Sequence, residues 1–476
     1  MDRRRTIVVA GGGITGMSAA FYAVKYLAER GGPVDVVLVE KSRRLGGQIR
    51  TLRRDGFVIE QGPDSFLARK PSVLALAREL DLEAQLRATN PNPQAKKNYI
   101  LHKGKLHEMP PGLVLGIPTA LSPLIKTGLV SPLGKLRAAM DLLLPGRKDD
   151  GDESLGSFIK RRLGREVLDN MTEPLLAGIY AGDTEALSLQ ATFPQFRQIE
   201  REHRSLMLGL LKGKKNAPAT AAELPTIARG SLFLTFERGL STMVDRLEQS
   251  MPTVRKLTGS GIGRIVRESE GYKLTLECGT ELRADGVILA LPASATARLV
   301  ADIPEAAWLE TIAYASVANL ALAYREADVP RRLDGSGFVV PRREGRLITA
   351  CTWSSSKWPH AAPPGKVLLR TYVGRANAQE WLGMTEEELV AGVRADLKAT
   401  MGITAAPLFI EISRCLRSMP QYPIGHRDRL KELRARLAIE RPGMWLCGAG
   451  YEGVGIPDCI EQGRRAAEHA VSYMLS

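Results

Sequence analysis

Cysteine and histidine are scarce in this sequence, and neither is arranged for a disulfide framework or a metal site. The 476 residues include five cysteines, an odd and widely spaced set without a C-x-x-C pair, and six histidines, none at metal-ligand spacing. Small secreted domains pair their cysteines, and structural zinc sites need closely spaced thiolates or imidazoles. We therefore expect reduced thiols, no bound metal and a cytoplasmic protein.

Long apolar runs are missing as well. The most apolar stretch, residues 109–135, is interrupted repeatedly by prolines, so no segment reaches the ~20 residues that a transmembrane helix needs. This stretch could contact a membrane or line an apolar pocket, but a buried lobe of short helices is the simpler interpretation. The basic start and the apolar run Thr6–Ala10 imitate a secretion signal, yet this run ends at Gly11 and the pattern continues as a folded unit.

Aromatic residues make up only 5% of the chain, which argues against the stacking platforms that bind nucleic acid bases. Lysine and arginine number 66 against 52 acidic residues, giving a net charge of +14. This excess favours an anionic partner: nucleic acid, a membrane surface, or a phosphate or polycarboxylate ligand. A basic, solvated surface without such a partner is an equally open interpretation. We predict no nucleic acid partner.

The chain is too long for one compact core, so two or three lobes are expected. Residues 6–10 and 35–40 are short apolar runs typical of buried parallel strands, and residues 14–30 between them have the pattern of a helix. Further along, the pattern predicts a helix over 71–82, an exposed loop over 210–229, a β-meander over 254–291, a strand over 444–448 and a helix over 457–475.

The strongest local motif is Gly11-Gly12-Gly13-Ile14-Thr15-Gly16, a G-x-G-x-x-G between the first strand and the first helix. Gly11 permits the tight turn, Gly13 lets the backbone approach a pyrophosphate, and Gly16 lets the helix pack closely on the strand. The phosphates of such a ligand bind at the helix N-terminus. The second strand ends at Glu40, whose carboxylate would accept hydrogen bonds from an adenosine ribose and disfavour NADP. We therefore predict a dinucleotide site.

The segments that follow Glu40 favour FAD over NAD. Residues 41–51 supply basic side chains and a second glycine pair, and residues 60–65 form a rigid turn with exposed donors. The glycine-rich segment 450–458 joins a strand to a helix whose N-terminus would stabilise negative charge on a reduced flavin. Each segment alone is typical of a loop, but together they predict a three-part flavin site.

Longer phrases carry a more specific resemblance. They include Glu173-Pro-Leu-Leu-Ala-Gly-Ile-Tyr-Ala-Gly-Asp, Lys357-Trp-Pro-His, Ser418-Met-Pro-Gln-Tyr and Gly453-Val-Gly-Ile-Pro-Asp-Cys-Ile. Nearly end to end, the chain resembles the flavin-containing amine oxidase and porphyrinogen oxidase superfamily. Within it, the chain is most similar to the oxygen-dependent, FAD-containing coproporphyrinogen III oxidases of Gram-positive bacteria, which form coproporphyrin.

The resemblance implies an α/β fold: a Rossmann-type FAD-binding domain with inserted α+β substrate-binding and helical lobes. The implied FAD domain is discontinuous and comprises residues 1–65, 230–296 and 431–476. The substrate domain takes 66–110 and 297–430, and a largely helical lobe takes 111–229. Motifs and resemblance together predict that the cofactor is bound by Gly11, Gly12, Gly13, Ile14, Thr15, Gly16, Glu40, Lys41, Arg44, Gly47, Gly62, Pro63, Asp64, Ser65, Val254, Val454, Gly455 and Ile456.

The implied reaction is the six-electron oxidation of coproporphyrinogen III in heme synthesis, in three two-electron steps at the flavin, with O2 as acceptor and H2O2 as product. The cofactor performs the difficult step, and the sequence offers no Ser/His/Asp set, so no catalytic side chain is predicted. By similarity, Lys70 would pair with a substrate propionate, Ile179 would pack on the macrocycle and Tyr372 would orient the ring. A solvated lysine, a core isoleucine and a strand tyrosine are the alternatives.

Two other reactions stay open. Protoporphyrinogen IX oxidation is the same chemistry on a substrate with two propionates instead of four, and amine oxidation is a more distant alternative. The chain departs from the family at Cys415, where its members carry Trp, so the flavin contact of that Trp is not expected here. The expected partners are the tetrapyrrole, O2 and, transiently, downstream enzymes of heme synthesis. The expected location is the cytoplasm, with peripheral membrane contact as a further option.

Overall fold

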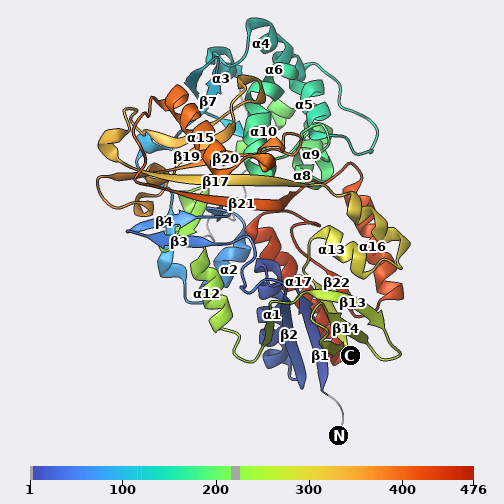
Figure 1. The fold of residues 1–476 in the computed structure, drawn as a ribbon. Coiled ribbons are helices and arrows are strands. Elements are labelled where there is room, and N and C mark those ends of the chain that lie inside the picture. The colour runs from blue at the N-terminus through green and yellow to red at the C-terminus, as the bar shows by residue number, and fades with distance from the viewer. Residues whose placement is uncertain (1–3, 115, 119–120, 216–225) are drawn as a thin grey trace.

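A parallel sheet forms the lower half of the molecule and a larger mixed sheet the upper half, as drawn in Figure 1. The computed structural model describes residues 4–114, 116–118, 121–215 and 226–476. The parallel sheet has the strand order β12-β2-β1-β16-β22. Its strands are β1 (Arg5–Ala10), β2 (Val34–Glu40), β12 (Arg255–Thr258), β16 (Gly286–Leu289) and β22 (Met444–Leu446).

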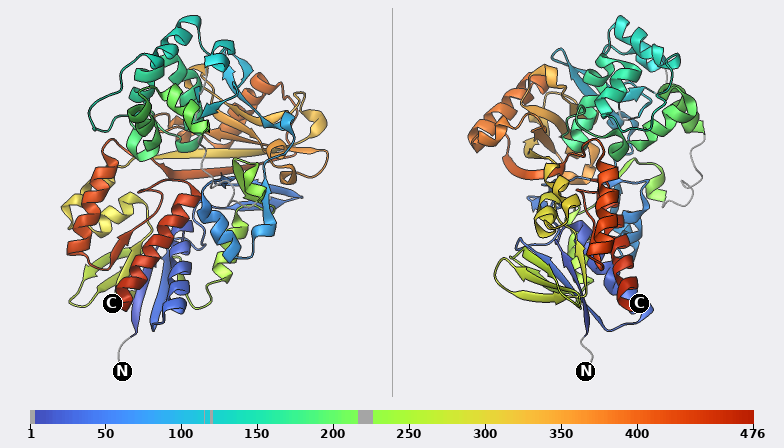
Figure 2. Two further views of the ribbon diagram at one scale, coloured as in Figure 1. Left: turned by 180° about the vertical axis from the view of Figure 1, so that it is seen from behind. Right: turned by 90° about the vertical axis from the view of Figure 1, so that its right-hand side faces the viewer.

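Alternate residues of β1 enter two separate cores. Ile7 and Val9 pack in the core that contains helices α1 and α17, whereas Val8 packs on the opposite face of the sheet. Helices α1 and α17 lie side by side (Figure 2), and a Cβ atom on Gly463 would lie 2.3 Å from the carbonyl oxygen of Thr15, so this glycine permits their close approach. The helices of this layer are α1 (Ile14–Arg30), α2 (Pro71–Glu79), α12 (Ser241–Gln249) and α17 (Ile456–Leu475).

A three-stranded antiparallel sheet and two helices cover the other face of the parallel sheet. They are β13 (Ile262–Arg267), β14 (Tyr272–Leu276), β15 (Glu281–Ala284), α13 (Ala293–Leu299) and α16 (His426–Glu440). The meander predicted over 254–291 is wrong at both ends, because residues 255–258 pair with β2 in the parallel sheet, and so do residues 286–289 with β1. Residues 286–289 are all buried, as in an interior parallel strand, whereas 281–284 alternates between exposed and buried positions.

The seven-stranded sheet lies across the carboxyl ends of the parallel strands, and helix α15 (Glu386–Met401) packs on its far face. Its strand order is β21-β17-β20-β19-β18-β7-β8. The strands are β7 (Lys97–His102), β8 (Lys105–Glu108), β17 (Tyr314–Arg325), β18 (Gly335–Val339), β19 (Ile348–Trp353), β20 (Lys366–Val373) and β21 (Phe409–Pro420). Short strands connect the two halves: β3 (Thr51–Arg54), β4 (Phe57–Glu60), β5 (Phe66–Leu67), β6 (Leu86–Ala88) and β11 (Phe233–Phe236).

A lobe of short helices caps the upper half, as the sequence predicts. Its elements are β9 (Leu113–Val114), β10 (Ile117–Pro118), α3 (Leu121–Lys126), α4 (Pro132–Ala139), α5 (Leu155–Leu163), α6 (Arg165–Val167), α7 (Glu173–Tyr180), α8 (Leu189–Thr192), α9 (Pro194–His203) and α10 (Leu206–Lys215). Helix α11 (Thr226–Arg229) packs instead in the core that contains α1 and α17. Helices α10 and α11 replace both ends of the predicted loop 210–229, and residues 216–225 lie outside the described part. In the described ranges, no helix has the length and apolar character to cross a membrane.

Candidate functional site

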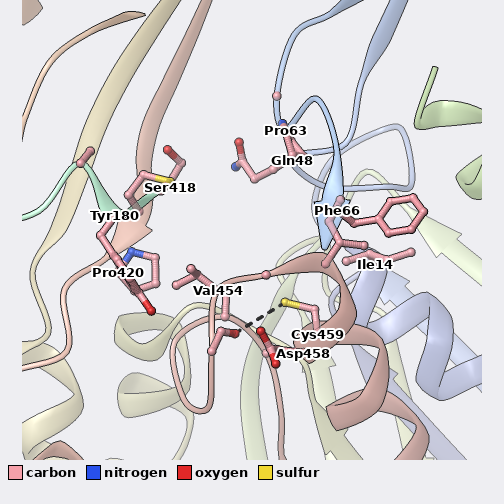
Figure 3. Close-up of a pocket in the computed structure, with 18 of the residues that line it drawn as sticks. Ile14, Gln48, Pro63, Phe66, Tyr180, Ser418, Pro420, Val454, Asp458 and Cys459 are labelled. Carbon is pink, nitrogen blue, oxygen red and sulfur yellow. Dashed lines mark hydrogen bonds between the residues drawn. The ribbon is translucent and has the colours of Figure 1, made fainter. Parts of the chain in front are cut away.

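A large cavity opens where the carboxyl ends of the parallel strands meet the seven-stranded sheet. Its volume is about 2600 Å³, well above the roughly 300–1,000 Å³ of a usual small-molecule pocket. Ile14 and Phe66 lie on one side of it, Tyr180 and Pro420 on the other, and Val454 between them (Figure 3). Ligands of open α/β sheets bind at this edge, and the space is enough for a dinucleotide and a second bulky molecule.

The glycines of the first turn are needed for different reasons. Gly11 has a φ of +103°, and its Cβ would lie 2.3 Å from the carbonyl oxygen of Ala290. At Gly16 a Cβ would lie 1.8 Å from the carbonyl oxygen of Gly11, so helix packing excludes any side chain there. At Gly13, by contrast, the nearest atom to a Cβ would be the Cα of Gly47, 4.0 Å away. Gly13 therefore presents bare backbone to the cavity, which is what a closely bound phosphate requires.

Two helices begin at the cavity without a side-chain cap. Gly13 is the N-cap of α1 and Gly455 is the N-cap of α17, and neither makes a side-chain capping hydrogen bond. The predicted cofactor residues around them, Ile14, Thr15, Val454 and Ile456, all line the cavity. The first N–H groups of a helix lack partners within the helix and attract negative charge. The N-terminus of α1 therefore suits the phosphates of a flavin dinucleotide, and the N-terminus of α17 suits the negative charge of its reduced ring.

Glu40 lines the cavity at the end of β2, where the sequence places a ribose acceptor. One carboxylate oxygen accepts a hydrogen bond from the backbone N–H of Gly12 at 2.6 Å. The other accepts from the backbone and the hydroxyl of Ser42, both at 2.7 Å. The carboxylate thus fixes the glycine turn by a hydrogen bond and is itself held at the cavity surface. Its oxygens have further lone pairs that can accept hydrogen bonds from a ligand.

The basic side chains of Lys41 and Arg44 are bound to other groups of the protein and are not free to contact a phosphate. Lys41 lines the cavity and forms an ion pair with Glu277, with 2.8 Å between Nζ and Oε1. Arg44 donates hydrogen bonds to the carbonyl oxygens of Leu45, Gly47 and Ile49 in its own loop. It does not line the cavity. It shapes the second glycine pair, and Gly47 itself lines the cavity.

The turn that follows β4 is fixed by side chains of the seven-stranded sheet. Asn319 donates to the carbonyl oxygen of Gln61 at 2.8 Å, and Arg370 donates to that of Gly62. A Cβ on Gly62 would lie 1.8 Å from the carbonyl oxygen of Gln48, so the turn is also pressed against the glycine-pair loop. Gly62 and the predicted residues after it line the cavity, and the sheet therefore holds this part of the cavity wall in place.

Asp64 forms an ion pair with Lys357 of helix α14 (Ser354–Lys357), with 2.9 Å between Nζ and Oδ2. Burial disfavours ionisation of this carboxyl, but the charges of Lys357 and Arg370 and the hydroxyl of Ser65 outweigh burial and lower its pKa. Asp64 is therefore a fixed negative charge, and its partners bring two cations to the same wall of the cavity.

Lys70 lines the cavity but is not free. Its Nζ lies 2.5 Å from Oδ1 of Asp458, in the first turn of α17. The Asp458 carboxylate also packs against the glycine turn, because a Cβ on Gly453 or Gly455 would lie 2.8–2.9 Å from its atoms. A substrate carboxylate that binds Lys70 must therefore share it with Asp458.

Tyr372 lies in β20, and its hydroxyl accepts a hydrogen bond from Arg370 at 3.0 Å. Burial raises the pKa of this phenol, so it stays neutral. Ile179 belongs to α7, but its side chain lies outside what the structure describes, although its neighbours Ala177 and Tyr180 line the cavity. Cys415 also lines the cavity, with its Sγ 3.5 Å from the carbonyl oxygen of Gln61.

The predicted site residues Gly12, Gly16 and Arg44 do not line the cavity but belong to the glycine loops beside it. Val254 does not line the cavity either. It precedes β12 and is buried in the core with α1 and α17. Since β12 runs parallel to β2, its amino end lies at the edge of the sheet away from the cavity, and Gly261 after its carboxyl end lines the cavity. Sequence reasoning also missed Asp458, Lys357 and Arg370, which reach the site only through tertiary contacts.

This chain is similar to known proteins along nearly its whole length. The family described as flavin containing amine oxidoreductase matches residues 14–471. A coproporphyrinogen III oxidase of Bacillus subtilis (strain 168) is 44% identical over 475 residues, covering 100% of both chains. One of Staphylococcus aureus is 39% identical, covering 99% of this chain and 100% of its own. A solved structure from Exiguobacterium sp. 255-15, named as a candidate protoporphyrinogen oxidase, is 35% identical with a TM-score of 0.85, covering 100% of this chain and 99% of that one. The cofactor is FAD, and this chain belongs to the family of flavin-containing amine oxidoreductases.

Proposed function

We propose that this protein oxidises coproporphyrinogen III to coproporphyrin III, with FAD as cofactor and O2 as the final electron acceptor. The observation that carries the proposal is the cavity itself: a dinucleotide cradle continues into a chamber large enough for a tetrapyrrole and lined by several cations. The two curated relatives described above are named coproporphyrinogen III oxidases and match over their full length. Heme biosynthesis is the corresponding pathway.

Bound FAD would supply the hydride acceptor for each two-electron step, and O2 would then be reduced to H2O2. The protein binds and orients the two molecules. We assign the phosphates to the N-terminus of α1 beside Gly13, the adenosine ribose to Glu40, and the flavin ring to the N-terminus of α17 at Gly455. Asp64, fixed by Lys357, keeps the turn after β4 in its place along the cofactor.

We assign the substrate to the chamber beneath the seven-stranded sheet. Lys70 would pair with one propionate and Tyr372 would orient the macrocycle, while Ile179 would pack against it. No step requires a side-chain nucleophile, because the cofactor carries the redox chemistry and the enclosing walls keep the reactive product of each step from solvent.

Protoporphyrinogen IX is the second candidate substrate, favoured by the name of the similar Exiguobacterium protein. We further propose a cytoplasmic enzyme that contacts downstream heme-synthesis enzymes transiently. The exposed side chains of Ile125, Leu133, Leu136 and Leu143 on the helical lobe, in a chain of net charge +14, support a peripheral membrane contact.

The test is steady-state turnover of the purified, FAD-loaded protein with coproporphyrinogen III and protoporphyrinogen IX, followed by porphyrin fluorescence and H2O2 release. We expect a higher kcat/KM for coproporphyrinogen, with about three H2O2 per porphyrin, as a six-electron oxidation requires. Faster turnover of protoporphyrinogen would overturn the substrate assignment, and oxidation of neither would overturn the proposed function.

A further inference from the structure

The longest strand pair of the seven-stranded sheet is interrupted at the rim of the cavity. Ala315 of β17 pairs with Met419 of β21, and Val317 pairs with Cys415, so Ser316 alone stands opposite residues 416–418. Bulges of this kind re-aim side chains and are common beside active sites. The two surplus residues of β21 are thus extruded where the strand borders the cavity.

Arg417 is the residue at the centre of this bulge, and its backbone has a φ of +46°. A residue with a side chain adopts this left-handed conformation at an energetic cost, and such residues gather at functional sites. The bulge is locked by two hydrogen bonds: Arg417 N–H donates to the hydroxyl of Ser316, and Ser418 donates to the carbonyl oxygen of Cys415, both at 3.0 Å. The strained conformation is therefore specified and not an accident of a loose loop.

Arg417 is among the residues that line the cavity. The other lining cations discussed above are engaged: Lys41 with Glu277, Lys70 with Asp458, and Lys357 with Asp64. In the described part of the chain, the exposed Arg417 side chain has neither an ion pair nor a hydrogen bond.

Other basic residues line the same cavity as Arg417. Burial raises the pKa of the lining residue Tyr314, and the positive charge of Arg417 opposes that shift. Arg427 and Lys431 lie one turn apart on α16, line the same cavity and, like Arg417, have no acidic partner within the described ranges. Asp428, which adjoins Arg427 in sequence, lines the cavity too.

We propose that Arg417 is a specificity-determining residue that binds a carboxylate of the substrate at the rim of the cavity, with Arg427 and Lys431 as a supporting basic surface. The proposal rests on the proposed function and extends it, because it names where the anionic periphery of a tetrapyrrole is held. A tetracarboxylate in this cavity needs cations that are not already neutralised, and Arg417, a lining residue held in a costly backbone conformation, is one of them. A phosphate of the cofactor is the other source of anionic oxygens, and the experiment separates the two.

The experiment compares Arg417→Gly, Arg417→Lys and the control Lys103→Gly in the FAD-loaded protein. Lys103 has a φ of +52° in the turn between β7 and β8 and does not line the cavity, so its replacement removes the same charge and the same left-handed side chain elsewhere. Binding is measured by fluorescence titration with coproporphyrin III and with its uncharged tetramethyl ester. Tm and the FAD affinity of each apoprotein are measured alongside.

We expect Arg417→Gly to weaken coproporphyrin III binding about ten- to a hundredfold, as loss of a charge-assisted contact does, while ester binding changes less than twofold. Arg417→Lys should recover part of the loss. Both glycine variants should keep or raise Tm by about 1 °C, because glycine relieves the left-handed backbone. Equal losses for acid and ester, or binding like that of Lys103→Gly, would overturn the proposal, and so would a selective loss of FAD. Preference of the enzyme for protoporphyrinogen would overturn the proposed substrate but leave this comparison valid.

Discussion

Gly13 and Gly16 lie three residues apart in one motif, yet a single methyl group should affect them in opposite ways. Gly13 has extended backbone angles, φ −70° and ψ 176°, and its Cβ would meet nothing nearer than the Cα of Gly47 at 4.0 Å. Gly13→Ala should therefore stabilise the apoprotein by about 0.4–1 kcal/mol, because alanine has fewer unfolded conformations. The same methyl group occupies the space that we assign to a phosphate. Overpacking by such a group costs about 1–3 kcal/mol, which weakens FAD binding about 5- to 150-fold.

Gly16→Ala is the matched control. Its Cβ would lie 1.8 Å from the carbonyl oxygen of Gly11, so the helix must shift and the fold itself should lose stability. The assay is urea unfolding of both apoproteins, combined with titration of each with FAD followed by flavin fluorescence. If Gly13→Ala binds FAD as the wild type does, or is destabilised as much as Gly16→Ala, then the dinucleotide does not lie over Gly13.

Three further changes probe other parts of the site. Glu40→Ala removes a charged acceptor, which costs about 1.5–3 kcal/mol and should loosen FAD about ten- to a hundredfold in a fluorescence titration; unchanged affinity would remove Glu40 from the site. Lys70→Met should raise KM for coproporphyrinogen more than for protoporphyrinogen and leave the FAD spectrum intact. Asp458→Asn, which removes the ion-pair partner of Lys70, should lower KM for coproporphyrinogen. Equal effects on both substrates would contradict a propionate contact. Burial raises the pKa of Glu60 from 4.5 to about 7, so the stability that is present at low pH is lost as pH rises from about 4.5 through 7, by about 3 kcal/mol. Urea unfolding at pH 5 and pH 8 should show this loss in the wild type and not in Glu60→Gln, and identical pH profiles of the two proteins would refute the prediction.

Short-range features of this protein were predictable from sequence, and long-range ones were not. The strand, glycine turn, helix and acid of the first βαβ unit lie within forty residues, so local pattern alone places Gly13 and Glu40 at one edge of a sheet. The partners of Lys70 and Asp64 lie 388 and 293 positions away, and no local pattern encodes such pairs.

The predictions of secondary structure were wrong where one sequence pattern is consistent with two different structures. An apolar run such as residues 286–289 is equally consistent with a meander strand or an interior parallel strand, and only strand order decides between them. The left-handed Arg417 has no sequence signature at all, because its conformation results from the register of β17 against β21.

The close packing of α1 on α17 has a consequence for how the protein matures. The glycine turn between β1 and α1 is synthesised well before β16, β22 and α17, which complete its sheet and cover α1. Until then α1 exposes the apolar face that it buries in the native core, a state prone to aggregation and favourable for chaperone binding. Cofactor capture must therefore follow synthesis of α17, and supply of FAD to a fragment that lacks α17 should not rescue its folding.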